Sequence, residues 1–217
     1  MPNLCNLKEL RSCLFATWNC RGDKWAVGGS SGHVFIGTYN VACSMWIAFS
    51  QTEEPPQGRP LHKASVMQVR FDPLSGRALA SASADGQVII TSAYKPEVDD
   101  ADTGSGPFAG LTAEFGEILF RLKTNVWNNT IAWSPSGETL AFASHDCELH
   151  FAEFNPDLVA QAIASRGKAK PETKRVVYNG NPILNGTFIN ETTYVGCGYD
   201  NAPIVFKKQG DGSWAFA

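Results

Sequence analysis

VMQVRFDPLSGRALASASADGQVIITSAY occupies Val66–Tyr94 and carries the pattern from which the architecture of this chain can be worked out. It reads as an alternating segment ending in Phe71, a polar turn, a segment of small residues, an Asp-Gly turn at Asp85, and a second apolar segment. Alternation places one face of a strand inward, and Asp-Gly supplies the positive φ that a two-residue hairpin requires. The stretch therefore predicts three consecutive antiparallel strands.

The same pattern recurs outward from this stretch in both directions. The other copies are LFATWNCRGDKWAVGGSSGHVFIGTYN (Leu14–Asn40), NTIAWSPSGETLAFASHDCELHFAEF (Asn129–Phe154) and ILNGTFINETTYVGCGYDNAPIVFK (Ile183–Lys207). The first segment of each copy ends in an aromatic residue: Trp18, Phe71, Trp133 and Phe188. A lone small sheet leaves both faces uncovered, so such units stack on copies of themselves.

A fourth, outer strand is expected after each copy. Candidates are residues 45–50, 117–123, 175–179 and 213–217. The sequence thus predicts an all-β, WD-repeat β-propeller that is incomplete, with about four blades of four antiparallel strands and loop insertions. We expect one partial domain over residues 1–217, with blades at roughly 14–51, 66–124, 129–180 and 183–217. The WD dipeptide itself is absent.

Composition narrows the function classes. Hydrophobic residues make up 43% and charged residues 18% of the 217 positions, as in globular domains, and the net charge of −3 argues against nucleic acid as a partner. No apolar run reaches the roughly 18 residues of a membrane span, and no signal-like segment opens the chain. We therefore expect a cytoplasmic protein. The six cysteines contain no C-x-x-C pair, so neither a metal site nor disulfides are expected.

The insertion at residues 95–116 is acidic, then glycine-rich, and contains Phe108 and Phe115. It is interpreted either as a solvated loop or as a partner-binding loop in which exposed Phe108 and Phe115 are the apolar anchors. Asp99 and Asp100 are adjacent in this loop, and nothing in the sequence around them indicates burial.

The insertion at residues 155–174 is predicted to contain a short helix from Asp157 to Arg166, ended by Gly167. A small basic cluster follows that includes Lys168 and Lys170. These lysines are candidates for contact with an acidic partner surface; the alternative is a solvated linker.

Ser144, His145 and Asp146 are consecutive and resemble the residue types of a hydrolase triad. A triad is assembled in space from separated positions, however, so adjacency favours a structural role. We predict that Asp85, His145, Asp146 and Asp200 take part in hydrogen-bond networks that join strands within blades. No phosphate-binding loop, dinucleotide fingerprint or zinc-protease motif occurs. The chain is therefore not expected to be an enzyme or to bind a cofactor or small-molecule substrate; a hydrolase using His145 and Asp146 is the alternative.

Several segments are more specific than generic repeat features. They are KWAVGGSSGHV, HKASVMQVRFDP, LASASADGQVIITSAYKPEV, FGEILF, IAWSPSGETLAFASHDCELHFAEF and TTYVGCGYDNAPIVFK. In order and spacing, from about Leu14 to the C-terminus, they resemble subunit 1 of the actin-related protein 2/3 complex, the WD-repeat subunit of about 40 kDa. The family forms a seven-bladed propeller, so the chain is expected to cover its middle four blades.

The resemblance implies a structural scaffold subunit of an actin-nucleating complex that supports branched actin filament assembly. It also implies that the other subunits and the actin filament are partners, and that the protein is located in the actin-rich cytoskeleton. The alternative is a generic WD-repeat adaptor of another multiprotein complex.

Overall fold

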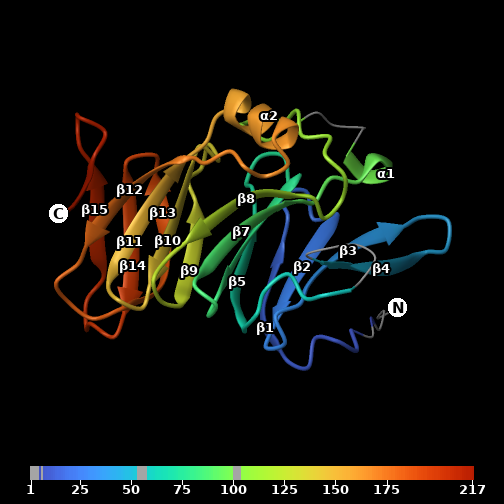
Figure 1. The fold of residues 1–217 in the computed structure, drawn as a ribbon, viewed down its shortest axis with the longest axis horizontal. Helices are drawn as coiled ribbons and strands as arrows, with labels where there is room; N and C mark the ends of the chain where they lie inside the picture. Colours follow the sequence, from blue (N-terminus) through green and yellow to red (C-terminus); the bar gives the residue numbers. More distant parts are fainter. Residues whose placement is uncertain (1–4, 6, 53–57, 100–103) are drawn as a thin grey trace.

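Sixteen strands form four separate four-stranded antiparallel sheets in the computed structural model, which describes residues 5, 7–52, 58–99 and 104–217. Figure 1 shows the sheets side by side in chain order, with the two ends of the chain at opposite ends of the row. In each sheet the strands pair in sequence order, as the repeat predicts. The expectation of an incomplete four-bladed propeller is confirmed.

The strands of the first two blades are β1 (Cys13–Trp18), β2 (Lys24–Gly29), β3 (Val34–Asn40), β4 (Met45–Gln51), β5 (Val66–Phe71), β6 (Ala78–Ser83), β7 (Gln87–Ser92) and β8 (Ile118–Lys123). Those of the last two are β9 (Asn128–Trp133), β10 (Thr139–Ser144), β11 (Glu148–Glu153), β12 (Glu172–Val177), β13 (Ile183–Asn190), β14 (Thr193–Gly198), β15 (Ile204–Lys208) and β16 (Trp214–Phe216). The expected outer strands correspond to β4, β8, β12 and β16. Two helices lie in the insertions, α1 (Pro96–Asp99) and α2 (Pro156–Ala164).

Three apolar layers lie between consecutive blades and hold the arc together. The layer between blades one and two contains Ile36, Val69 and Ile89, all fully buried. The layer between blades three and four is aromatic, and Phe151 stacks on Trp214 with ring centroids 3.9 Å apart. Because each blade buries one face on its neighbour, no blade has a complete core of its own.

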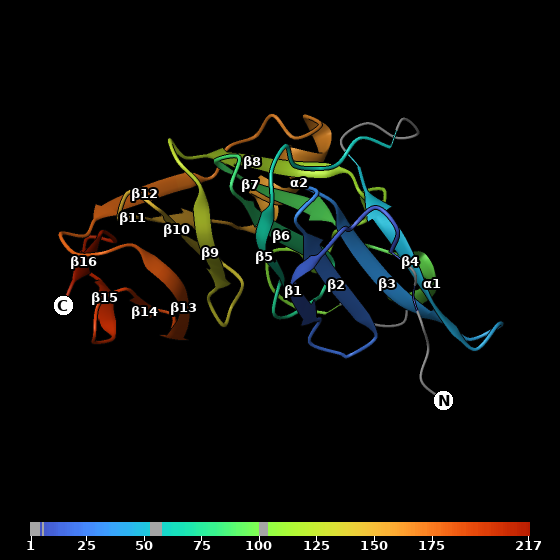
Figure 2. The same ribbon diagram turned by 90° about the horizontal axis from the view of Figure 1, so that it is seen from below.

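The inner strands of blades two, three and four are joined by polar side chains. Gln68 on β5 accepts hydrogen bonds from the Thr130 hydroxyl (2.8 Å) and the Ile131 amide (2.6 Å) on β9. Its amide nitrogen donates to Asn185 Oδ1 on β13 at 3.4 Å. Figure 2 shows these inner strands facing one another from neighbouring sheets. Buried amides that are satisfied in this way fix how adjacent blades align.

Helix α2 covers the middle of the arc (Figure 1). Asn155 caps it, since its side-chain oxygen accepts a hydrogen bond from the Leu158 amide at 2.8 Å. Val159 and Ala162 are buried against the core between blades two and three. The predicted helix in this insertion is confirmed, and Gly167 with a φ of 75° follows its end. Within the described residues, no helix is long and apolar enough to cross a membrane.

Candidate functional site

Asp85 belongs to a buried hydrogen-bond network in blade two. Its carboxylate lies 3.1 Å from His62 Nδ1, and the other ring nitrogen of His62 lies 2.8 Å from the Ser81 hydroxyl. Burial raises the pKa of Asp85, but hydrogen bonds from His62 and from the amides of Lys63 and Gln87 outweigh it and hold that pKa below its ordinary value. The network ties the segment before β5 to the β6–β7 turn.

His62 and Ser81 were not selected from the sequence. The signal for His62 was available, because a His ahead of the first strand of a blade is part of the WD-repeat signature. In blade two this histidine is His62, which follows Pro60-Leu61 and opens the segment HKASVMQVRFDP.

In blade three the candidate residues meet in a different way. The Ser144 hydroxyl donates to Asp146 at 2.5 Å, whereas the His145 ring stacks on Trp127 with centroids 4.9 Å apart. His145 Nδ1 lies 3.4 Å from the Asn129 amide nitrogen. The histidine does not stand between the hydroxyl and the carboxylate, so these side chains do not form a nucleophile–base–acid relay.

Asp200 in blade four joins two chain segments near the surface. Its carboxylate accepts hydrogen bonds from the backbone amide (3.0 Å) and the side-chain amide (2.8 Å) of Asn181. These hydrogen bonds lower the pKa of Asp200. Among the described residues, no group of three or more His, Cys, Asp and Glu side chains could hold a metal ion.

Phe108 and Phe115, in the insertion at residues 95–116, are not exposed anchors. Phe108 is fully buried and packs edge-on against Trp133, with centroids 5.4 Å apart, in the core between blades two and three. Phe115 is half-buried beside Phe49, and the Lys95 ammonium lies 4.3 Å from its ring centroid. The expected exposure of Phe108 is wrong because the insertion folds back over the arc and closes the gap between two sheets.

Asp99 corrects a second expectation about this insertion. Its side chain is completely buried, and its carboxylate pairs with the equally buried Lys24 ammonium on β2 at 2.7 Å. Arg21 pairs with the same carboxylate, and the Lys95 amide donates to it at 2.7 Å. Two cations and a backbone donor satisfy the buried charge, so Asp99, which seemed solvated from the sequence, lies inside the protein. Asp100 lies outside the described residues.

The buried Lys24–Asp99 pair links the insertion at residues 95–116 to blades one and two. The Lys24 ammonium also donates to the carbonyl oxygens of Gly76 and Ala93, each at 2.9 Å. Burial lowers the pKa of Lys24, and Asp99 only partly opposes this effect. Blade one contributes the cation, blade two the carbonyl groups and α1 the anion, so the pair fixes α1 on the propeller.

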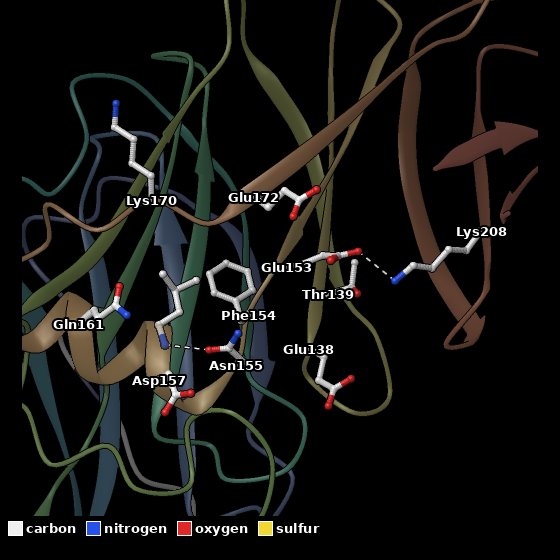
Figure 3. A pocket seen from close by; sticks show the side chains of 11 residues that line it. Glu138, Thr139, Glu153, Phe154, Asn155, Asp157, Gln161, Lys170, Glu172 and Lys208 are labelled. Atoms are coloured by element: carbon white, nitrogen blue, oxygen red, sulfur yellow. Dashed lines mark hydrogen bonds and ion pairs between the residues drawn. The ribbon is translucent and has the colours of Figure 1, made fainter. Parts of the chain in front are cut away.

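The surface beside α2 carries one of the predicted partner-binding lysines. Lys170 lines a cavity of about 540 Å³ bounded by α2, the β10 and β11 ends and blade four (Figure 3). Four of the lining side chains are carboxylates: Glu138, Glu153, Asp157 and Glu172. Lys208 from blade four pairs with Glu153 at 2.9 Å. Lys168 is exposed on the far side of the same insertion, beside the C-terminal end of α2.

All four inner strands meet at a second cavity, of about 360 Å³, which we call the axial pocket. Its lining residues on these strands are Thr17, Trp18, Arg70, Phe71, Ala132, Trp133, Gly186 and Thr187, and the β1–β2 and β5–β6 turns add Asn19, Cys20, Asp72 and Pro73. The Arg70 guanidinium lies over the Phe15 ring, 4.7 Å from its centroid. Burial lowers the pKa of Arg70. The axial pocket was not found from the sequence, because nothing local to Arg70 marks it.

Comparison with known proteins supports both the fold and the resemblance. No protein-family model matches the chain. Arp2/3 complex subunit 1A of Arabidopsis thaliana is 30% identical over 218 residues, covering all of this chain and 52% of that protein. The subunit 1A-B of Xenopus laevis is 26% identical (99% of this chain, 53% of that protein), and subunit 1 of Schizosaccharomyces pombe is 24% identical (96% and 50%).

The β-propeller domain of Myceliophteria thermophila Cps50 (Swd1) has a similar fold, with a TM-score of 0.61 at 15% identity over 91% of this chain and 54% of that one. The chain spans about half the length of the curated relatives it matches. Over its whole length the chain thus matches Arp2/3 complex subunit 1, and its four WD40-type propeller blades are consistent with a partial sequence of that subunit.

Proposed function

We propose that this chain is part of a non-catalytic scaffold subunit of an Arp2/3 complex, which supports branched actin assembly by binding the other subunits and the actin filament. The observation that carries the proposal is the match to Arp2/3 complex subunit 1 along the whole chain. The propeller fits this role, since a rigid array of sheets presents loops and insertions to several partners. A cytoplasmic, cytoskeleton-associated location follows from the same proposal.

Lys168 and Lys170 are the proposed contacts with an acidic partner surface. Both side chains are exposed, and neither has an ion pair or hydrogen bond within the described residues. Helix α2 is anchored by its buried face, so it holds the start of this segment at a defined place on the arc.

Co-purification tests the proposal. The tagged 217-residue chain is expressed in eukaryotic cells, and the recovered proteins are identified by mass spectrometry against an unrelated tagged propeller. Enrichment of the actin-related subunits is expected. Their absence, together with recovery of a different stable complex, would show a generic WD-repeat adaptor instead.

A charge reversal tests the contact. The double variant K168E/K170E is expected to lower recovery of the actin-related subunits, because it places like charge against an acidic surface. The control is K207E, at an exposed lysine on β15 that has no ion pair among the described residues. Equal recovery by both variants would remove the two lysines from the interface.

A further inference from the structure

Unpaired cations gather around the β2–β3 turn, where blade one adjoins blade two. Lys8 and Arg11 from the segment before β1 and Lys63 from the segment before β5 line one cavity of about 560 Å³, which we call the basic pocket. All three residues are exposed, and none of their side chains has an ion pair or hydrogen bond within the described part of the chain. The fold thus brings together three cations from two distant segments without supplying an anion for each.

The walls of the basic pocket are hydrogen-bonded to one another. The Ser31 hydroxyl in the β2–β3 turn donates to the Glu9 carbonyl oxygen in the segment before β1 at 2.6 Å. The Gly32 carbonyl oxygen in the same turn accepts a hydrogen bond from the His62 amide, in the segment before β5, at 3.1 Å. All three segments are therefore fixed to the same turn, and only the cationic side chains have to be ordered when a ligand binds.

The charge of the basic pocket indicates which anion it fits. Glu9 supplies the one carboxylate among the described lining residues, so three cations against one anion leave a net charge of about +2 when His33 is neutral, although the chain as a whole carries −3. A phosphate monoester carries about −1.5 to −2 at pH 7 and has three acceptor oxygens. It matches the pocket better than a carboxylate does, because a carboxylate would leave one positive charge uncompensated.

The donors of the basic pocket also suit phosphate. The planar guanidinium of Arg11 can donate to two phosphate oxygens at once. Arg11 has a φ of 56°, a left-handed conformation that favours glycine, and residues with such strained backbones concentrate at binding sites. The Ser12 hydroxyl donates to the Ser30 hydroxyl at 2.9 Å, which leaves the Ser30 proton to donate to a ligand.

The lining favours a phosphorylated protein segment over a lipid headgroup. Basic clusters that hold a protein on an anionic membrane contain about four to eight cations, and interfacial segments also bury apolar side chains in the lipid. The basic pocket has three cations, and its described lining contains no large apolar side chain. A single phosphorylated side chain requires only a small cationic cluster of this kind.

We propose that the basic pocket binds a phosphorylated serine or threonine side chain of a protein partner, with Arg11 holding two phosphate oxygens and Lys8 and Lys63 neutralising the remaining charge. The inference rests on the pocket and does not depend on the Arp2/3 assignment. A contact of this kind forms only after the partner has been phosphorylated, so it makes binding at the junction of blades one and two a regulated event.

The test uses the purified 217-residue chain at fixed ionic strength and follows the backbone amide NMR signals of Ser30 and Ser31. The ligands are acetyl-Ala-Ser-Ala-amide with and without a phosphate on its serine, acetyl-Ala-Glu-Ala-amide, and inorganic phosphate. We expect the phosphopeptide to bind at least roughly tenfold more tightly than the unphosphorylated peptide, the factor typical of one charge-assisted hydrogen bond. It should also bind several-fold more tightly than the Glu peptide and than inorganic phosphate.

Three variants connect this preference to the basic pocket. R11Q and K63Q should each weaken phosphopeptide binding several-fold, and both should keep the Tm of the native chain because the replaced side chains are exposed and unpaired. The matched control is K207Q, at an exposed lysine on β15 outside the pocket, which should bind as the native chain does. If R11Q does not fold, R11K replaces it, since Lys keeps the charge but not the planar fork, and it should still bind several-fold more weakly.

Several results would overturn the proposal. Equal binding of the phosphorylated and unphosphorylated peptides, or an unchanged preference in R11Q or K63Q, would remove phosphate from the basic pocket. Equal affinity for the Glu peptide would assign the pocket to carboxylates, and equal affinity for inorganic phosphate would assign it to the free ion. Phosphatidylcholine vesicles containing a phosphoinositide are the last comparison: if the chain binds them and excess phosphopeptide does not compete, the pocket belongs to a membrane contact.

Discussion

Removing the Asp99 carboxylate should destabilise the whole arc, although Asp99 lies in an insertion. In Asp99→Ala, the Lys24 ammonium stays fully buried and keeps only the two carbonyl acceptors, Gly76 and Ala93. Breaking a buried ion pair by removing one partner costs about 3–5 kcal/mol, and the remaining acceptors place this case near the lower end, at about 3 kcal/mol. For a chain of this size, that corresponds to a loss of roughly 6–12 °C in Tm.

The assay is urea unfolding followed by tryptophan fluorescence, with Glu97→Ala as the matched control. Glu97 is in the same short helix but exposed, so its replacement should change the unfolding free energy by less than about 0.5 kcal/mol. Equal losses in the two variants would refute the reasoning, because they would show that the buried pair contributes nothing specific.

The same variant makes a pH prediction whose sign follows from Lys24. Burial already lowers the pKa of Lys24, and losing Asp99 should lower it further. The folded chain then releases this proton before the unfolded chain does, so stability rises with pH up to the unfolded value of about 10.4. The unfolding free energy of Asp99→Ala should therefore fall short of that of the native chain by less at about pH 9.5 than at about pH 7. A deficit that grows with pH would contradict this account.

Three further predictions follow from the geometry. Because the pKa of Asp85 is lowered in the folded chain, its contribution to the unfolding free energy is complete above about pH 4 and is lost as the pH falls through that lowered pKa. The variant Asp85→Asn should therefore lose less stability than the native chain when the pH is lowered into this range. An equal loss of stability in the two chains would contradict this. Gly186→Ala should cost about 1–3 kcal/mol in urea unfolding, since its Cβ would lie 2.0 Å from the Tyr194 hydroxyl, whereas Gly210→Ala meets open space and should be nearly neutral. Phe108→Ala should lower the unfolding free energy by about 3–5 kcal/mol, because Phe108 is fully buried. If the variant instead lost partner binding while its stability stayed unchanged, Phe108 would have to be an exposed partner contact.

The architecture could be predicted from the sequence because its signals are local. Alternation, small-residue strands and turn residues recur in each copy, and each acts over a few neighbouring positions. Helix α2 was also predictable to within one or two residues, since the predicted range Asp157–Arg166 overlaps the observed range Pro156–Ala164. The network around Asp85 was half predictable: the turn aspartate stands in a repeated position, but its partner His62 lies 23 residues earlier in a separate insertion.

Tertiary structure alone decided which insertion residues are buried and which charges are paired. Asp99 reads as solvated among acidic neighbours, and only the packing of α1 on blades one and two brings it to Lys24, which lies 75 residues away. Phe108 reads as an exposed anchor until the insertion closes over the sheets, and Arg70 reads as an ordinary strand residue until four inner strands converge. Turn and strand propensities are set by adjacent residues, whereas burial and ion pairing depend on distances across the fold, which a single repeat does not encode.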